Sequence, residues 1–127
     1  MINYTFIIPT RNIPLLLNRC LNSIPLRNDI QIIVVDDNSD PSVVDFNNYP
    51  GKDIPNIEIY YTKEGKGAGY ARNVGLNYVK GKWVIFADSD DFFLSNVESL
   101  LDEYANSDYD VIYFKVNSVN SDTLEPS

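Results

Sequence analysis

Histidine is missing from this sequence of 127 residues, and cysteine occurs once, at position 20. Without histidine the chain offers no imidazole general base, no Ser-His-Asp triad and no His-based zinc site. One cysteine permits no internal disulfide and is compatible with a reducing compartment. Because Cys20 lies on the apolar face of a predicted helix, we expect a buried structural thiol there rather than a nucleophile.

Basic residues are scarce, with 10 Lys and Arg against 18 Asp and Glu, for a net charge of −8. This balance argues against a nucleic-acid partner, because phosphate backbones demand clusters of Lys and Arg. An acidic protein can still bind a phosphate ligand through a metal cation. No apolar run approaches the roughly 20 residues of a membrane helix, and residues 1–10 lack the features of a signal peptide. We expect a cytoplasmic domain, although the full-length protein could associate with a membrane.

Short apolar runs predict strands at residues 4–9, 31–36, 57–61, 83–87 and 111–116. Residues 32–35 are apolar at consecutive positions, as expected where helices cover both faces of a sheet. Apolar residues at helical spacing predict three helices between these runs. Their expected end signals are Asn12 as a first N-cap, Gly81 as a second helix stop, and Ser95 with Glu98 as a capping box. The alternation predicts one α/β domain with a mainly parallel sheet.

The cluster of Asp88, Asp90 and Asp91 follows the strand predicted at residues 83–87. In open parallel sheets, ligands bind beyond the carboxyl ends of the strands. Three carboxylates within four residues repel one another unless they are solvated or neutralised by a cation. Hard oxygen ligands suit Mg²⁺ or Mn²⁺, which take substrate phosphates as further ligands. The alternative is a solvated acidic turn that binds nothing. This alternative is less favoured because the cluster follows a buried strand and a second strand also ends in acidic residues.

That second acidic strand end is Asp36 and Asp37, where at least one carboxylate should point into the crevice and accept hydrogen bonds from a base or a ribose. For residues 38–40, an ordinary turn without a role in binding is a fair alternative. The glycine-rich residues 65–69 lead into a helix whose first N–H groups favour anions, but they do not match the P-loop spacing, so a flexible loop remains open. Arg72 could reach a phosphate or pair with the acidic rim.

Four segments together resemble the family 2 glycosyltransferases of GT-A fold, and they extend over about residues 3–116. They are FIIPTRN at 6–12, IVVDDNS at 33–39, GYARNVG at 69–75 and FADSDD at 86–91. The resemblance implies a Rossmann-like α/β sheet flanked by helices. It also implies that residues 1–127 are the nucleotide-sugar-binding half of a truncated domain, with the acceptor-binding half absent.

The resemblance further implies a set of donor-binding residues: Pro9, Thr10, Arg11, Asp37, Arg72, Asn73, Asp88, Ser89 and Asp90. Asp37 would contact the base, usually uracil. Asp88 and Asp90 would form the Asp-x-Asp motif that binds Mn²⁺ or Mg²⁺, with Asp90 the direct ligand and Asp88 nearer the ribose. Arg11 departs from the Tyr or His that family members commonly carry at the rim of the nucleotide pocket.

The implied function is metal-dependent binding of a nucleoside diphosphate sugar, expected to be a UDP-sugar, for inverting transfer to a saccharide or lipid-linked hydroxyl acceptor. The catalytic base is expected beyond residue 127, so the chain alone is expected to transfer no sugar. One alternative is a nucleotide-sugar-binding module without catalysis. A phosphoacceptor receiver domain is disfavoured, because its acidic pair follows the first strand, whereas here that strand ends in Pro9 and Thr10.

Overall fold

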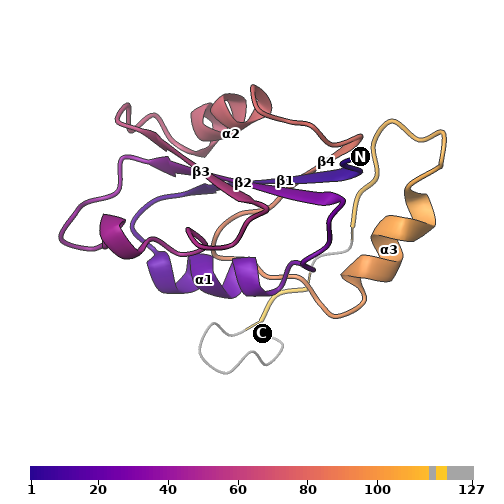
Figure 1. Ribbon diagram of the computed structural model, residues 1–127, viewed down its shortest axis with the longest axis horizontal. Helices are drawn as coiled ribbons and strands as arrows, with labels where there is room; N and C mark the ends of the chain where they lie inside the picture. The colour runs from indigo at the N-terminus through magenta and orange to yellow at the C-terminus, as the bar shows by residue number, and fades with distance from the viewer. Residues whose placement is uncertain (115–116, 120–127) are drawn as a thin grey trace.

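The computed structural model, which describes residues 1–114 and 117–119, contains a parallel sheet of four strands (Figure 1). The strands are β1 (Tyr4–Thr10), β2 (Ile30–Asp37), β3 (Ile57–Thr62) and β4 (Trp83–Phe86), in the order β3-β2-β1-β4. The register pairs Tyr4 of β1 with both Ile30 and Trp83, and Ile32 of β2 with Ile57. The predicted α/β class with a mainly parallel sheet is confirmed.

Helices cover both faces of this sheet (Figure 1). They are α1 (Pro14–Asn22), α2 (Ala68–Leu76) and α3 (Val97–Tyr104), with a 3₁₀ turn, η1 (Phe46–Asn48), between β2 and β3. Leu17 of α1 and Leu101 of α3 pack in the core on one face, and Ala71 of α2 packs on the other. This double cover explains why consecutive residues of β2 are apolar, since residues 32–35 are all fully buried.

Two glycines allow close approaches on the α2 side of the sheet. A Cβ at Gly75 would lie 2.8 Å from Ile7 Cγ2, so only glycine lets this helix pack so near β1. The prediction that Gly81 stops α2 is wrong, because the helix ends at Leu76. Gly81 instead lies against β1, where its N–H donates to Thr5 Oγ1 at 2.8 Å and a Cβ would lie 2.6 Å from that atom.

The predicted side-chain caps of α1 and α3 are also wrong. Ile13 precedes α1 as its N-cap, and Asn12 lies outside the helix with a φ of 60°. The Asn12 side chain accepts a hydrogen bond from the Asp40 N–H instead, so it is used between loops rather than at the helix start. Helix α3 begins at Val97 after Asn96, without a side-chain cap, which leaves Ser95 one residue too early for a capping box.

The apolar run at 111–116 predicts a fifth strand, and residues 111–114 form none, while 115–116 lie outside the described residues. Val111 is 66% exposed and Tyr113 is 92% exposed. These two exposed side chains bury little apolar surface, so they lack the packing that stabilises a strand. Within residues 1–114 and 117–119, no helix is both long enough and apolar enough to cross a membrane.

Candidate functional site

The predicted site residues meet at the carboxyl edge of the sheet. β1 lies between β2 and β4, and the strand order reverses at β1, which is where ligands bind in open α/β sheets. Thr10 pairs with Asp36 across this edge, and the Ala87 N–H donates to the Ile7 carbonyl just before Asp88. With strands about 4.8 Å apart, β2 and β4 lie about 10 Å, or two strand spacings, from each other across the sheet.

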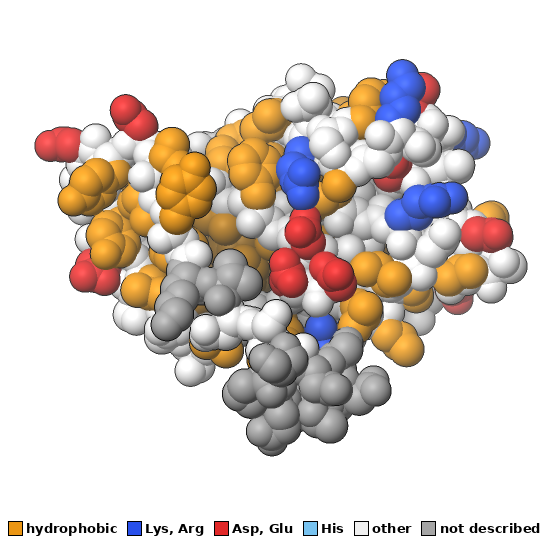
Figure 2. Space-filling view, turned by 180° about the vertical axis from the view of Figure 1, so that it is seen from behind, with side chains coloured by type: hydrophobic (Ala, Val, Ile, Leu, Met, Phe, Trp, Pro, Cys, Tyr) orange, Lys and Arg blue, Asp and Glu red, His pale blue; other side chains and the backbone are white. Residues whose placement is uncertain are grey.

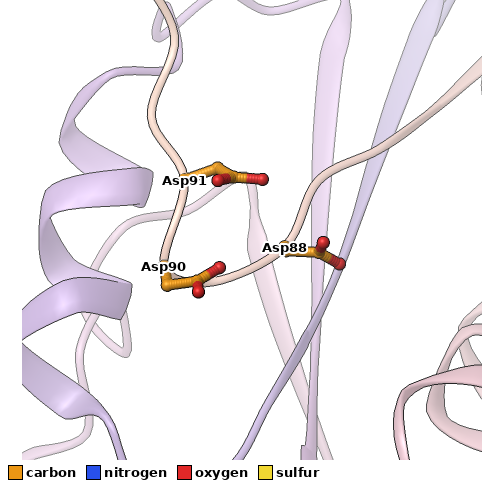
Figure 3. Close-up of side chains that lie close together, drawn as sticks. All are labelled: Asp88, Asp90 and Asp91. Atoms are coloured by element: carbon orange, nitrogen blue, oxygen red, sulfur yellow. The ribbon is translucent and has the colours of Figure 1, made fainter. Parts of the chain in front are cut away.

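The loop after β4 brings three carboxylates together (Figure 3). Asp88, Asp90 and Asp91 each offer an oxygen within 4.8 Å of the other two, and all three residues are exposed. Partial burial, followed by repulsion from Asp90 and Asp88, raises the pKa of Asp91. A divalent cation would relieve this repulsion, and the all-oxygen donor set fits Mg²⁺ or Mn²⁺. The intervening Ser89 is buried.

Arg72 of α2 reaches this acidic loop. Its Nη2 lies 2.7 Å from Asp88 Oδ1, in an ion pair whose side chains are 35% and 54% exposed. Figure 2 shows acidic side chains gathered near the middle of this face, beside a basic side chain. Of the two interpretations of Arg72, pairing with the acidic rim is therefore the one that this structure contains. Asn73 follows it in α2 and is exposed.

Asp37, at the end of β2, is engaged by the glycine-rich loop. Its carboxylate accepts hydrogen bonds from Thr62 Oγ1 at 2.7 Å, from the Gly65 N–H at 3.1 Å and from the Gly67 N–H at 2.7 Å. Although burial alone would raise it, these hydrogen bonds hold the pKa of Asp37 below its usual range. Both glycines have positive φ, of 62° and 96°, which turns their N–H groups toward the carboxylate. The anion that these amides bind is thus Asp37 itself.

Asp36, beside it, points to the opposite face of the sheet and is 1% exposed. It accepts a hydrogen bond from the Tyr49 hydroxyl at 2.5 Å and one from the Ser39 N–H at 2.9 Å. Burial and this contact with Asp36 raise the pKa of Tyr49. Sequence reasoning missed Tyr49, because nothing in the sequence distinguishes it among nine tyrosines.

A second feature that sequence reasoning missed links the loops after β1 and β2. The Asn12 N–H donates to Ser39 Oγ at 2.9 Å, and the Asp40 N–H donates to Asn12 Oδ1 at 2.7 Å. Asn12 and Asn38 both have positive φ, near 60°, which asparagine tolerates better than most residues. Arg11 is exposed at this rim, with its Nε 3.5 Å from the Asn38 carbonyl oxygen. The sequence carried one usable signal, an asparagine within two residues of the end of β1 and of β2.

The remaining candidates are at the end of β1. Pro9 and Thr10 end β1 between the two acidic loops, and both are buried. Two open hollows of about 370 Å³ lie elsewhere, one along residues 41–47 and one between α1 and residues 48–54. Cys20 is buried as expected, and burial raises the pKa of its thiol to about 12.

This fold, with carboxylates at two strand ends, is typical of α/β domains whose ligands bind beyond the carboxyl ends of parallel strands. Residues 5–127 match the family described as Glycosyl transferase family 2, and the chain belongs to this family.

Two relatives and one solved structure show how far the similarity extends. The chain is 36% identical over 115 residues to the minor teichoic acid biosynthesis protein GgaB of Bacillus subtilis, covering 82% of this chain and 13% of that protein. It is 32% identical over 129 residues to the poly(ribitol-phosphate) beta-N-acetylglucosaminyltransferase TarS of Staphylococcus aureus, covering 94% and 22%. The crystal structure of S. aureus TarS in complex with UDP-GlcNAc matches with a TM-score of 0.66 at 26% identity, covering 81% of this chain and 32% of the other.

Proposed function

We propose that this chain is the donor-binding part of a glycosyltransferase and that it binds a UDP-sugar together with Mn²⁺ or Mg²⁺. The observation that carries this proposal is the cluster of Asp88, Asp90 and Asp91, whose oxygens lie within 4.8 Å of one another at the carboxyl edge of the sheet. Membership of the family and the UDP-GlcNAc complex of TarS support the choice of ligand. Transfer would go to a saccharide or lipid-linked hydroxyl.

The spacing of the two strand-end loops suits the two ends of such a ligand. The nucleoside would lie over Pro9, Thr10 and Arg11, beside the loop that Asp37 holds in place. The diphosphate would extend across the end of β1 toward Asp88 and Asp90, which follow the strand on the other side of β1. Asp37 would reach the base only by exchanging at least one hydrogen bond that it now accepts from Thr62 or the glycine amides.

The residues around the diphosphate have separate tasks. Asp90 and Asp88 would hold the divalent cation, which supplies Lewis-acid stabilisation of the leaving diphosphate when it is bound. Arg72 pairs with Asp88 across the gap between α2 and β4, and it would turn its guanidinium toward the phosphate once a cation neutralises that carboxylate. We assign the general base to none of the residues that hold the cation, since a carboxylate bound to a cation is a poor proton acceptor.

Isothermal titration calorimetry with UDP, in Mn²⁺ and in EDTA, tests the proposal. We expect binding that is at least tenfold tighter with Mn²⁺, and we expect Asp90→Asn to lose that difference. Asp53→Asn removes the same charge from an exposed turn before β3 and serves as the matched control. Equal affinity for UDP in Mn²⁺ and EDTA would contradict the metal role, and no binding in either buffer would contradict the nucleotide site.

A further inference from the structure

Helix α1 and its C-cap residue, Ser23, contact the acidic loop through three residues in all. Cys20 Sγ lies 3.8 Å from the Asp88 carbonyl oxygen, and Arg19 Nη2 donates to the Asp90 carbonyl at 2.9 Å. One turn further along, Ser23 Oγ accepts from the Phe93 N–H at 2.9 Å while donating to the Cys20 carbonyl. These contacts bracket all three carboxylates along the chain. The path of the loop is thus set by a helix that precedes it by about 70 residues.

Arg19 makes the most extensive of these contacts. Besides its hydrogen bond to the Asp90 carbonyl, its guanidinium carbon lies 4.8 Å from the centroid of the Phe92 ring. It therefore contacts the residues on both sides of Asp91. The neighbouring Leu17, Cys20 and Leu21 are buried in the core. Their packing holds the part of α1 that carries the Arg19 side chain.

We propose that Arg19 is a positioning residue for the carboxylates that bind the divalent cation, an inference that rests on the proposed function. Three carboxylates within 4.8 Å repel one another, and an unsupported exposed loop would spread them apart. The Arg19 guanidinium donates to the Asp90 carbonyl and lies over the Phe92 ring, and these two contacts restrict movement of the loop backbone. Residues that orient metal ligands from outside the ligand shell commonly change metal affinity by 10- to 100-fold when they are replaced.

The sign of the effect separates this role from a simple charge effect. Removing a positive charge near three carboxylates would, by Coulomb attraction alone, tighten the binding of a cation. Greater freedom of the loop would instead weaken the binding of the cation. For Arg19→Met we therefore expect Mn²⁺ affinity in the presence of UDP to fall by about tenfold. Arg19→Lys keeps a donor for the Asp90 carbonyl, and we expect it to recover part of the loss.

The experiment is a Mn²⁺ titration of the UDP-saturated protein, followed by calorimetry or by the electron paramagnetic resonance signal of free Mn²⁺. Arg27→Met is the matched control, because Arg27 pairs with Asp29 and Asp102 at the opposite end of β1. We expect this control to leave Mn²⁺ affinity unchanged. Affinity for UDP measured in EDTA should stay constant in both variants, which a general disturbance of the fold would not allow.

Three outcomes are informative. Absence of Mn²⁺ binding by the unmodified protein would overturn the proposed function itself. Binding by the unmodified protein, with unchanged or tighter binding by Arg19→Met, would overturn only the role of Arg19. If Arg19→Met does not fold, Ser23→Ala provides the second test, because it removes the acceptor of the Phe93 N–H. Ser23→Ala should weaken Mn²⁺ binding in the same direction, and an unchanged affinity there would overturn the inference.

Discussion

Two strand ends in this molecule carry clusters of aspartate, and they differ in almost every physical respect. At the end of β2, Asp36 and Asp37 are 1% and 3% exposed, and protein donors occupy their carboxylates. After β4, Asp88, Asp90 and Asp91 are exposed and face one another within 4.8 Å. The first pair is hydrogen-bonded to neighbouring loops, and the second cluster is the site that we propose for the cation.

The difference shows that a carboxylate at a strand end acquires its role from the donors that surround it. Asp36 accepts a hydrogen bond from the Tyr49 hydroxyl, and Asp37 accepts hydrogen bonds from two glycine amides, so protein donors already occupy oxygens of both carboxylates. After β4, three carboxylates lie together; Asp88 is paired with Arg72, and Arg19 is a second cation close to Asp91. Exposed carboxylate oxygens that face one another are ones that a cation can bind.

The largest effect that we predict is for Asp36→Ala, which should lower the free energy of unfolding by about 3 kcal/mol. The substitution leaves the buried Tyr49 hydroxyl and the Ser39 N–H without their acceptor. Chemical denaturation followed by circular dichroism measures the change. Asp53→Ala is the exposed control, and an equal loss in both variants would remove the distinction that we draw for the β2 end.

Asp37→Asn should destabilise by about 2 kcal/mol at neutral pH, because an amide replaces a carboxylate that accepts from Thr62, Gly65 and Gly67. Since the pKa of Asp37 is lowered in the folded state, the carboxylate contributes its full stability above the unfolded value of about 3.9. That contribution is lost as the pH falls through the folded pKa. The gap between unmodified protein and variant, measured by urea unfolding, should therefore shrink below about pH 4. A constant gap from pH 3 to 7 would contradict this role.

Arg72→Met should change stability by no more than about 0.5 kcal/mol, because its ion pair with Asp88 is largely exposed. Its effect on ligand binding should be larger, with weaker binding of UDP in Mn²⁺ by calorimetry. Lys66→Met, an exposed cation of the glycine-rich loop, is the matched control for loss of charge. A large loss of stability without a change in UDP affinity would place Arg72 with the structural residues of the β2 end.

The smallest effect on stability is expected for Asp90→Ala in metal-free buffer, with no loss or a slight gain. The substitution removes one of three mutually repelling carboxylates from an exposed loop. Thermal unfolding in EDTA measures it. A loss comparable to that of Asp36→Ala would mean that Asp90 stabilises the loop, and the contrast between the two strand ends would disappear.

The sequence predicted the sheet class, the two acidic strand ends and all four strands that the described residues form, together with a fifth at 111–116 that residues 111–114 do not form, because apolar runs and carboxylates are local signals. It did not predict the hydrogen bonds that divide the aspartates into two groups, since the donors Tyr49, Gly65 and Gly67 lie 13 to 30 residues away. The same limit applies to Asn12. Its residue type and its position just before α1 are typical of a helix N-cap, but it is hydrogen-bonded to Ser39 and Asp40 instead. Hydrogen bonds between loops depend on how the folded chain brings those loops together, and the periodicity of apolar residues in the sequence carries no information on this.

The most direct test compares the thermal unfolding of Asp36→Asn and Asp90→Asn, each with UDP in Mn²⁺ and in EDTA. Ligand that binds only the folded state raises the midpoint of unfolding. We predict that Asp36→Asn unfolds at a lower temperature and keeps the increase caused by Mn²⁺, whereas Asp90→Asn keeps its midpoint in EDTA and loses that increase. The reverse pattern, with Asp90→Asn destabilised in EDTA and Asp36→Asn unresponsive to Mn²⁺, would contradict the account.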